Sequence, residues 1–320
     1  MHPPKDKMRT AIITTFFNEA KDIETFLGAL NEQTKLPSEI ILVDAFSNDK
    51  TFEIAKEAIL KFNRILKITH LLRKKGNRSV GRNFAIKKST SSIIAVTDVG
   101  CIPDKKWFEK ITNPFKKGVP DVVAGGYKPK ASNNFEKSLA AYTSVPLEKG
   151  NKNFLPSSRS VSFKKTAWEK VGGYPEHLDT CEDLVFSRDL KRYGFNFVVV
   201  KSAFVKWPQR KNFMEAFKQF YSYAKGDGQA VYIRWQTPFL FGRYFLGLVI
   251  LFCWLTFNNS FFLILEAVGI LIYLFWSVWK NYKYVKDIEA IIILPILQVV
   301  SDVAVIAGMS IGLLNRPKSR

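Results

Sequence analysis

Three long apolar runs at the C-terminal end constrain this chain more than any other feature. They occupy residues 239–257, 260–279 and 288–314, and each is close to the roughly 20 residues that a bilayer-spanning helix needs. The chain is therefore predicted to be a membrane protein with a large polar front half. The third run would form a helix about 40 Å long and contains Pro295, so a spanning and a re-entrant path both stay open.

The polar front half is strongly basic. Of the net charge of +20, the tail residues Arg316, Lys318 and Arg320 carry three, and the four basic and four acidic side chains of residues 239–314 cancel, so +17 falls on residues 1–238. A basic domain attached to a bilayer favours anionic lipid or a phosphate-bearing substrate, although solubilising surface charge is an open alternative. The basic residues form no nucleic-acid recognition motif, and a hydrophobic content of 47% excludes a disordered tail.

The expected location is the cell membrane, with several crossings and the front half in the cytoplasm. The first ten residues are polar, and the apolar stretch 11–17 is too short for a secretory signal. The cysteines are far apart and form no metal-type pair, as expected in a reducing compartment; they are Cys101, Cys181 and Cys253. The same orientation is favoured by the lysines after the second apolar run, Lys280, Lys283 and Lys286.

Two acidic residues, Glu266 and Asp302, lie within the apolar runs. Charged groups at membrane depth mark functional sites by default, but pairing with each other or with Arg243 would serve a structural purpose. Both interpretations stay open on the sequence alone.

The front half alternates short β-like runs with amphipathic stretches, which predicts an α/β fold with a mostly parallel sheet. The expected strands are 10–15, 39–44, 65–72, 92–97 and 119–126, and the expected helices are 22–33, 51–62, 80–89 and 104–117. A second module is expected to contain helices 135–142, 164–171, 182–193 and 213–225 and strands 160–163 and 195–204. Two of the strands end at Asp44 and Asp98, at the carboxyl edge where open α/β sheets bind ligands.

Short motifs at this edge suggest a site for a nucleotide. Residues 15–19 and 44–51 place aromatic side chains beside carboxylates, a combination that can stack on a base and accept its N–H groups. Capping of the following helix is an equally good interpretation of Ser47 and Asp49. Residues 76–84 form a basic, glycine-bearing loop that runs into a helix, which suits a phosphate, although the loop is neither a Walker A motif nor a dinucleotide fingerprint.

Two further motifs contribute acids. Asp98 follows a strand and could bind Mg²⁺ or Mn²⁺ bridging a diphosphate, because these hard cations prefer oxygen ligands. Glu182 and Asp183 open a helix, where the helix dipole alone favours acids. A catalytic and a purely structural interpretation of that pair are both open at this point.

The ordered set of these motifs resembles the inverting glycosyltransferases of family 2, which have the GT-A fold. The resemblance covers about residues 9–235, and C-terminal spans are typical of the membrane-attached members. It implies a GT-A domain over residues 1–235, with a nucleotide-sugar half at about 9–126 and an acceptor half at about 127–235. A membrane domain at 236–320 would follow.

The resemblance also assigns roles to residues. It implies that Asp183, beside Glu182, is the general base and that Asp98 holds the metal. The donor-binding residues would be Thr15, Phe17, Glu19, Asp44, Ser47, Arg78, Arg82, Asn83 and Asp98, with Arg82 and Asn83 near the diphosphate. The acceptor side would be formed by Arg159, Gly173 and Tyr174.

Two departures from the family pattern stand out. Position 100 is glycine where many members carry a second metal-binding aspartate, so metal binding would depend on Asp98, the diphosphate and water. Residues 232–235 keep only the Arg-Trp ending of the motif found in processive synthases, which favours addition of a single sugar.

The expected function is transfer of a sugar from a nucleotide-sugar, with a UDP-sugar as the first choice, to a lipid-linked or membrane-presented glycan acceptor. One alternative is a synthase that places the sugar on a polyprenyl phosphate. The other is a non-catalytic membrane scaffold with a degenerate metal site. A transporter is a poor fit because three spans leave little room for a path.

Overall fold

The computed structural model describes residues 8–118, 120–144 and 154–316. The chain forms two compact units: unit 1 is Met1–Pro129 with Val145–Pro208, and unit 2 is Lys130–Ser144 with Gln209–Arg320. Lys318 and Arg320 of the basic tail lie outside the described residues. Unit 2 takes in two helices that precede residue 236, while the expected domain boundary there stays a prediction.

Unit 1 is built on an eight-stranded sheet with the order β3-β2-β1-β4-β7-β6-β8-β5. Strands β3, β2, β1 and β4 are parallel, whereas β7 runs antiparallel to β4 and β6, and β5 antiparallel to β8. The expected parallel arrangement therefore holds for the first four strands only. The bounds are β1 (Thr10–Phe16), β2 (Glu39–Asp44), β3 (Thr69–Arg73), β4 (Ile93–Val96), β5 (Ile102–Pro103), β6 (Val122–Lys130), β7 (Val161–Lys164) and β8 (Phe197–Pro208).

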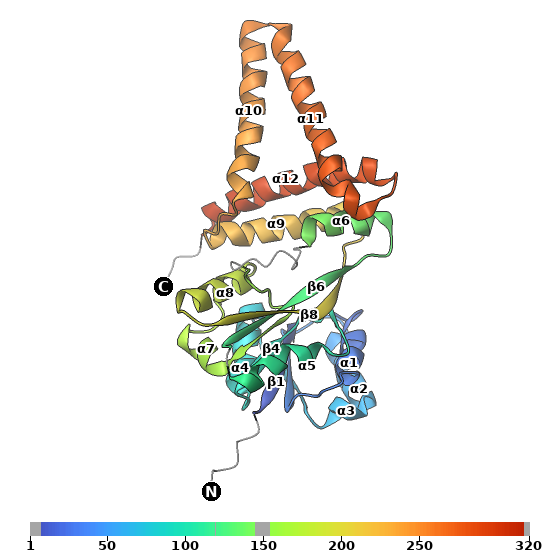
Figure 1. Cartoon of the computed structure of the whole chain (residues 1–320), viewed down its shortest axis with the longest axis vertical. Coiled ribbons are helices and arrows are strands. Elements are labelled where there is room, and N and C mark those ends of the chain that lie inside the picture. The colour runs from blue at the N-terminus through green and yellow to red at the C-terminus, as the bar shows by residue number, and fades with distance from the viewer. Residues whose placement is uncertain (1–7, 119, 145–153, 317–320) are drawn as a thin grey trace. The chain divides into compact units, whose positions relative to one another are not determined.

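Helices cover both faces of this sheet, because alternate strand residues point to opposite faces and both sets are apolar. Ile12 and Leu42 pack toward α1, α2, α3 and α5, whereas Ile13 and Val43 pack toward α4, α7 and α8. Figure 1 shows the two groups of helices on opposite sides of the strands. The bounds are α1 (Ile23–Asn31), α2 (Thr51–Lys61), α3 (Asn63–Leu66), α4 (Arg78–Lys88), α5 (Trp107–Thr112), α7 (Lys165–Lys170) and α8 (Glu182–Arg192).

Two sequence-based expectations for unit 1 need correction. The strand expected at 65–72 is the short helix α3 followed by β3, because the apolar pair Ile65 and Leu66 faces the core from a helical turn. Short apolar runs do not distinguish the two states by periodicity. The helix expected at 104–117 is α5 followed by a 3₁₀ segment, Asn113–Lys117, that contains a proline at its start.

Unit 2 is entirely helical in the part that the structure describes. It consists of α6 (Asn134–Thr143), α9 (Phe213–Gln229), α10 (Gln236–Phe257), α11 (Ser260–Val285) and α12 (Ala290–Leu314). The last three are long and apolar enough to cross a membrane. Asp302 of α12 forms an ion pair with Arg243 of α10, as the structural interpretation of this acid expected.

Gly125 in β6 provides a test of how the sheet is packed. A Cβ atom there would lie 2.0 Å from Ser160 Oγ and 2.5 Å from the Ala203 carbonyl oxygen, and Ser160 Oγ accepts the buried indole N–H of Trp107 at 2.9 Å. We expect Gly125→Ala to cost about 1–3 kcal/mol of unfolding free energy through overpacking and loss of this hydrogen bond. Thermal unfolding of the detergent-solubilised protein measures the effect. Gly100→Ala is the control, because that Cβ meets nothing within 4 Å; equal melting temperatures for the two variants would contradict the packing argument.

Candidate active site

The candidate site lies at the carboxyl ends of three parallel strands of unit 1. The β1–β2 register pairs Phe16 with Asp44, and the β1–β4 register pairs Ile13 with Val96. Asp98, two residues beyond Val96, therefore reaches the level of Thr15. The sheet thus brings to one edge the two carboxylates that the sequence placed at strand ends.

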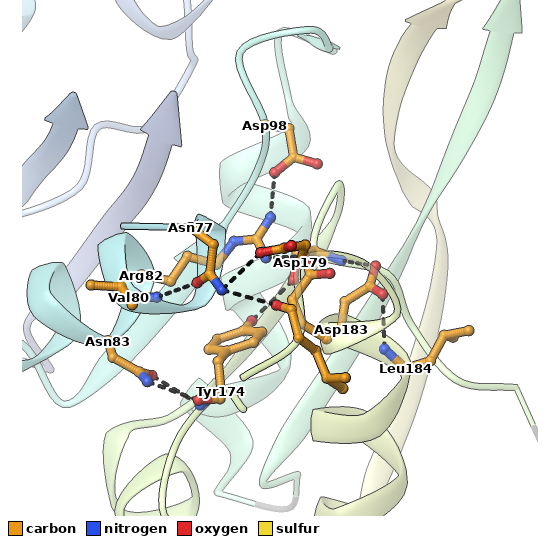
Figure 2. A network of polar contacts seen from close by, with 12 residues as sticks. Asn77, Val80, Arg82, Asn83, Asp98, Tyr174, Asp179, Asp183 and Leu184 are labelled. Carbon is orange, nitrogen blue, oxygen red and sulfur yellow. Dashed lines mark hydrogen bonds and ion pairs between the residues drawn. The ribbon is translucent and has the colours of Figure 1, made fainter. Parts of the chain in front are cut away.

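Arg82 connects the acids of this edge (Figure 2). Its guanidinium donates to Asp98 at 2.8 Å and to Glu182 at 2.7 Å, and only 1% of the side chain is exposed. Arg82 lies in α4, while Asp98 follows β4 and Glu182 begins α8. One buried cation therefore holds together three segments, two of which are a hundred residues apart in sequence.

The charges set the protonation of these acids in opposite directions. Burial by itself would raise the pKa of Asp98, but the positive charges of Arg82, Arg159 and Arg78 outweigh it and lower that pKa, so Asp98 is ionised at neutral pH. Burial raises the pKa of Glu182, and the negative charge of Asp183 adds to this effect, while Arg82 opposes it. Glu182 is therefore the acid that takes up a proton first.

Asp183 differs from its neighbour in being partly exposed. Its carboxylate accepts the backbone N–H of Leu184 at 2.8 Å and that of Ser158 at 3.2 Å. Cys181, just before α8, has φ of 67°, a left-handed conformation that starts the helix abruptly. The two adjacent acids consequently serve different partners: Glu182 binds Arg82, whereas Asp183 is oriented by backbone and stays within reach of solvent.

A second corner of the site surrounds Asp44. This carboxylate is fully buried; it accepts from the backbone and hydroxyl of Ser47 and from Arg73 Nε at 2.9 Å. The Arg73 guanidinium lies 4.6 Å from the ring centroids of both Phe46 and Phe52. Sequence reasoning missed Arg73. The signal that could have identified it is a basic residue at the end of β3, the strand next to β2.

The other expected donor residues lie around the same edge. Thr15 is buried and touches α4, since a Cβ on Gly81 would lie 2.3 Å from Thr15 Oγ1. Phe17 is 52% exposed and free to stack on a ligand. The Glu19 backbone N–H donates to Thr51 Oγ1, and Arg78 is exposed in the first turn of α4.

Three of the expected residues form a tightly bonded structural group. The Asn83 amide donates to the Tyr174 carbonyl and to Glu176, and its oxygen accepts from Trp168 and from the Tyr174 backbone, which fills its hydrogen-bonding capacity. Gly173 has φ of 85°, and a Cβ there would lie 2.8 Å from Asn83 Oδ1. Tyr174 is 2% exposed and stacks on Phe186. The Arg82 guanidinium lies 5.3 Å from the centroid of the Tyr174 ring, so this group packs against Arg82. The expected ligand contacts of Asn83 and Tyr174 stay predictions.

Arg159 lies over an aromatic platform. Its guanidinium is 4.1 Å from the Trp207 ring and 5.4 Å from the Tyr127 ring, and the two rings meet edge to face at 5.5 Å. Because Arg159 also lowers the pKa of Asp98, its charge acts on the same space. The expected place of Arg159 on the acceptor side stays a prediction.

The donor set fits a divalent cation that is held partly by its substrate. The described residues contain no group of three metal-ligating side chains, so Asp98 would be a single protein ligand, with a diphosphate and water completing the shell. Asp98 is ionised and its side chain is 33% exposed. At position 100, where a second acid would stand, a Cβ meets nothing within 4 Å.

Comparison with known proteins gives one family. Residues 11–168 match the family described as Glycosyl transferase family 2. The glycosyltransferase AglE of Haloferax volcanii is 25% identical over 225 residues, which cover 68% of this chain and 73% of AglE. The O-antigen chain rhamnosyltransferase RfbN of Salmonella typhimurium is 22% identical over 227 residues, covering 67% and 71% of the two chains.

A solved structure shares the fold along most of the chain. The mannosyltransferase PcManGT from Pyrobaculum calidifontis, in complex with GDP-Man and Mn²⁺, superposes with a TM-score of 0.60 at 16% identity, covering 98% of this chain and 89% of that one. The predicted GT-A architecture and the C-terminal apolar helices are thereby confirmed.

Removing the central cation tests the arrangement. We expect Arg82→Met to cost about 3–5 kcal/mol of unfolding free energy at neutral pH, because it leaves the buried Glu182 and the partly buried Asp98 without their partner. The cost should shrink in acid, since protonation of Asp98 and Glu182 removes the unpaired charges of the variant while wild type loses the stability that ionised Asp98 contributes. Thermal unfolding at several pH values measures this. Arg192→Met, at a side chain 73% exposed, is the control, and a cost for Arg82→Met that is independent of pH would contradict the electrostatic account.

Proposed function

Since the chain belongs to glycosyl transferase family 2, we propose that it moves one sugar from a UDP-sugar to a lipid-linked or membrane-presented glycan acceptor, with inversion at the anomeric carbon. Membership makes the chain a transferase, and its fold implies a nucleotide-sugar donor and a glycan acceptor. The observation that carries the proposal is the Asp98–Arg82–Glu182 network, which ties the ionised Asp98 to the start of α8, where the partly exposed Asp183 follows Glu182.

The donor half of the proposal depends on three kinds of group. Phe17 and Phe46 are about half exposed and offer faces on which a base stacks. Arg73, held by Asp44, offers the remaining N–H donors of its guanidinium to carbonyl oxygens of that base. Exposed Arg78 and the start of α4 are suited to the diphosphate, and UDP is proposed because it is the commonest nucleotide in this family.

The reaction requires a base and a stabilised leaving group. In the proposed step the acceptor hydroxyl oxygen forms a bond to the anomeric carbon, its proton passes to Asp183, and the bond between the sugar and the nucleoside diphosphate breaks. Asp183 is suited to this task because two backbone N–H groups orient its carboxylate. A bound Mg²⁺ or Mn²⁺ would neutralise charge on the departing diphosphate, and Arg82 keeps Asp98 ionised and in place for it.

The membrane half of the proposal concerns where the acceptor is presented. Three helices are long and apolar enough to span a bilayer, and the thiol of Cys101 is buried and free, as expected in a reducing compartment. We place the transferase unit on the cytoplasmic face of a cell membrane. Its acceptor would then be a lipid-linked saccharide in the same leaflet.

A donor screen tests the proposed activity. The purified protein in lipid, supplied with UDP- or GDP-sugars and Mg²⁺ or Mn²⁺, should release nucleoside diphosphate from a UDP-sugar. Asp98→Asn should lower this turnover by a factor of about 10² or more, since it removes the charge that holds the metal. Asp104→Asn, a partly exposed acid outside the site, should leave turnover unchanged. Turnover of GDP-sugars only would overturn the choice of nucleotide, and equal activity of both variants would overturn the metal site.

Asp183→Asn separates two classes of acceptor. A hydroxyl acceptor needs a base, so transfer should fall by about 10²–10⁴-fold, whereas a lipid phosphate is already ionised and should lose much less. Product formation with defined lipid-linked acceptors measures the difference. Asp189→Asn on the same helix, whose charge faces Arg192, serves as the matched control. A small loss for Asp183→Asn with a polyprenyl phosphate acceptor would favour the synthase alternative.

A further inference from the structure

Helix α12 is packed along α9 and not along the two other apolar helices. A Cβ on Gly308 would lie 2.4 Å from the Tyr221 carbonyl, one on Gly312 2.2 Å from the Lys225 carbonyl, and one on Gly228 2.6 Å from the Met309 carbonyl. The two backbones therefore touch over several turns. Since contacts advance along both helices together, α9 and α12 run parallel, as Figure 1 also shows.

The nature of α9 makes a transmembrane path for α12 untenable. Along its 17 residues α9 carries four charged side chains, Glu215, Lys218, Lys225 and Asp227, and it does not qualify as a span. If α12 crossed the bilayer, α9 would have to cross beside it and take these charges into the hydrocarbon, where charged groups are costly. Further polar contacts join the start of α12 to α6, from Asn134 to Glu289 and from Tyr142 to the Leu294 carbonyl.

The helices α10 and α11 contact α12 over part of their length only: Arg243 of α10 and Tyr273, at the middle of α11, reach Asp302. The buried residues of α10 are Thr237 and Leu240, near its start, and those of α11 are Ser277, Asn281 and Val285, near its end. A third span lying beside them would bury residues along their whole length. Figure 1 shows α12 running across the base of the α10–α11 hairpin.

One face of α12 is nonetheless built for lipid. Ile292, Ile296, Val299 and Val303 are 68, 43, 41 and 47% exposed and recur at a spacing that puts them on one side of a helix. Leu294, Leu297, Ala304, Gly308 and Gly312 are buried on the opposite side. In the apolar stretch of α12, 33% of the residues are buried by other parts of the chain. The corresponding share is 6% in α10 and 6% in α11.

A polar cluster sets the depth at which α12 would lie. Asp302 accepts from Arg243, Tyr244, Tyr273 and Gln298. Arg243 comes seven residues after the start of α10, which is about 10 Å of helix. Trp276 lies between the Arg243 and Lys280 cations, at 5.9 and 4.6 Å, in the manner of the aromatic and basic belt at a membrane interface.

We propose that α12 lies in the plane of the membrane, in the leaflet on the side of unit 1, and that only α10 and α11 cross the bilayer. Its apolar stripe binds the hydrocarbon just beneath the headgroups, at the depth of 5–10 Å or so that is usual for interfacial helices. Residue 315 then emerges on the same side as unit 1. This inference concerns α12 alone and holds whichever donor and acceptor the transferase uses.

Cysteine labelling tests the proposal in the full-length protein. In a background with Cys101, Cys181 and Cys253 replaced by alanine, single cysteines are placed by Lys50→Cys, Asn258→Cys and Asn315→Cys, all at exposed positions. A membrane-impermeant maleimide is then applied to sealed vesicles of each orientation. We expect position 315 to react on the same side as position 50 and on the side opposite to position 258. Reaction of positions 315 and 258 on the same side would overturn the proposal.

A depth measurement checks the same inference independently. Spin labels at positions 292, 296, 303 and 311, in variants that retain donor turnover, report their depth through collisions with lipid-soluble oxygen and a water-soluble nickel complex. An in-plane helix should give nearly equal depths at all four positions. A steady change of about 28 Å from position 292 to position 311, as a spanning helix would produce, would contradict it.

Discussion

The buried guanidinium of Arg82 is the interaction on which the rest of the site depends. A charge that is removed from water is tolerated only when it is paired and hydrogen-bonded, and Arg82 meets this condition through Asp98 and Glu182. The sheet edge that carries Asp98 and the helix that carries Asp183 are thereby joined through one guanidinium. Neither can shift without exposing an unpaired charge to the protein interior.

The same interaction gives the adjacent acids Glu182 and Asp183 different hydrogen-bond partners. Glu182 is directed inward to Arg82, whereas its neighbour Asp183 accepts the backbone N–H of Leu184 in α8 and that of Ser158 before β7. The left-handed conformation of Cys181 turns the chain just before this point. The two acids at the start of α8 thus have different environments: Glu182 is buried against Arg82, whereas Asp183 is partly exposed.

Much of this could be predicted from the sequence, because buried strands that end in an acid are visible as apolar runs followed by Asp44 and Asp98. Local patterns also marked α4 and α8. They could not show that Arg82 bonds Glu182, a hundred residues away in sequence. Nor could they show that Arg73 donates to Asp44 or that the Asn83 amide donates to the Tyr174 carbonyl. These contacts depend on strand order and on the antiparallel β7, which no local periodicity contains.

In unit 2, too, the sequence pattern alone does not determine how an element is placed. Hydropathy measures how apolar a segment is, and by that measure α12 is the most apolar of the three candidate spans. The path of α12 relative to the membrane depends on what packs against its buried face. Gly308 and Gly312 allow that face to approach the charged helix α9 closely. An apolar helix that packs against a charged helix can keep its own exposed face in lipid and the charges of its neighbour in water only at the interface between the two. The positions of Gly308 and Gly312 therefore argue more strongly for the path of α12 than its hydrophobicity does.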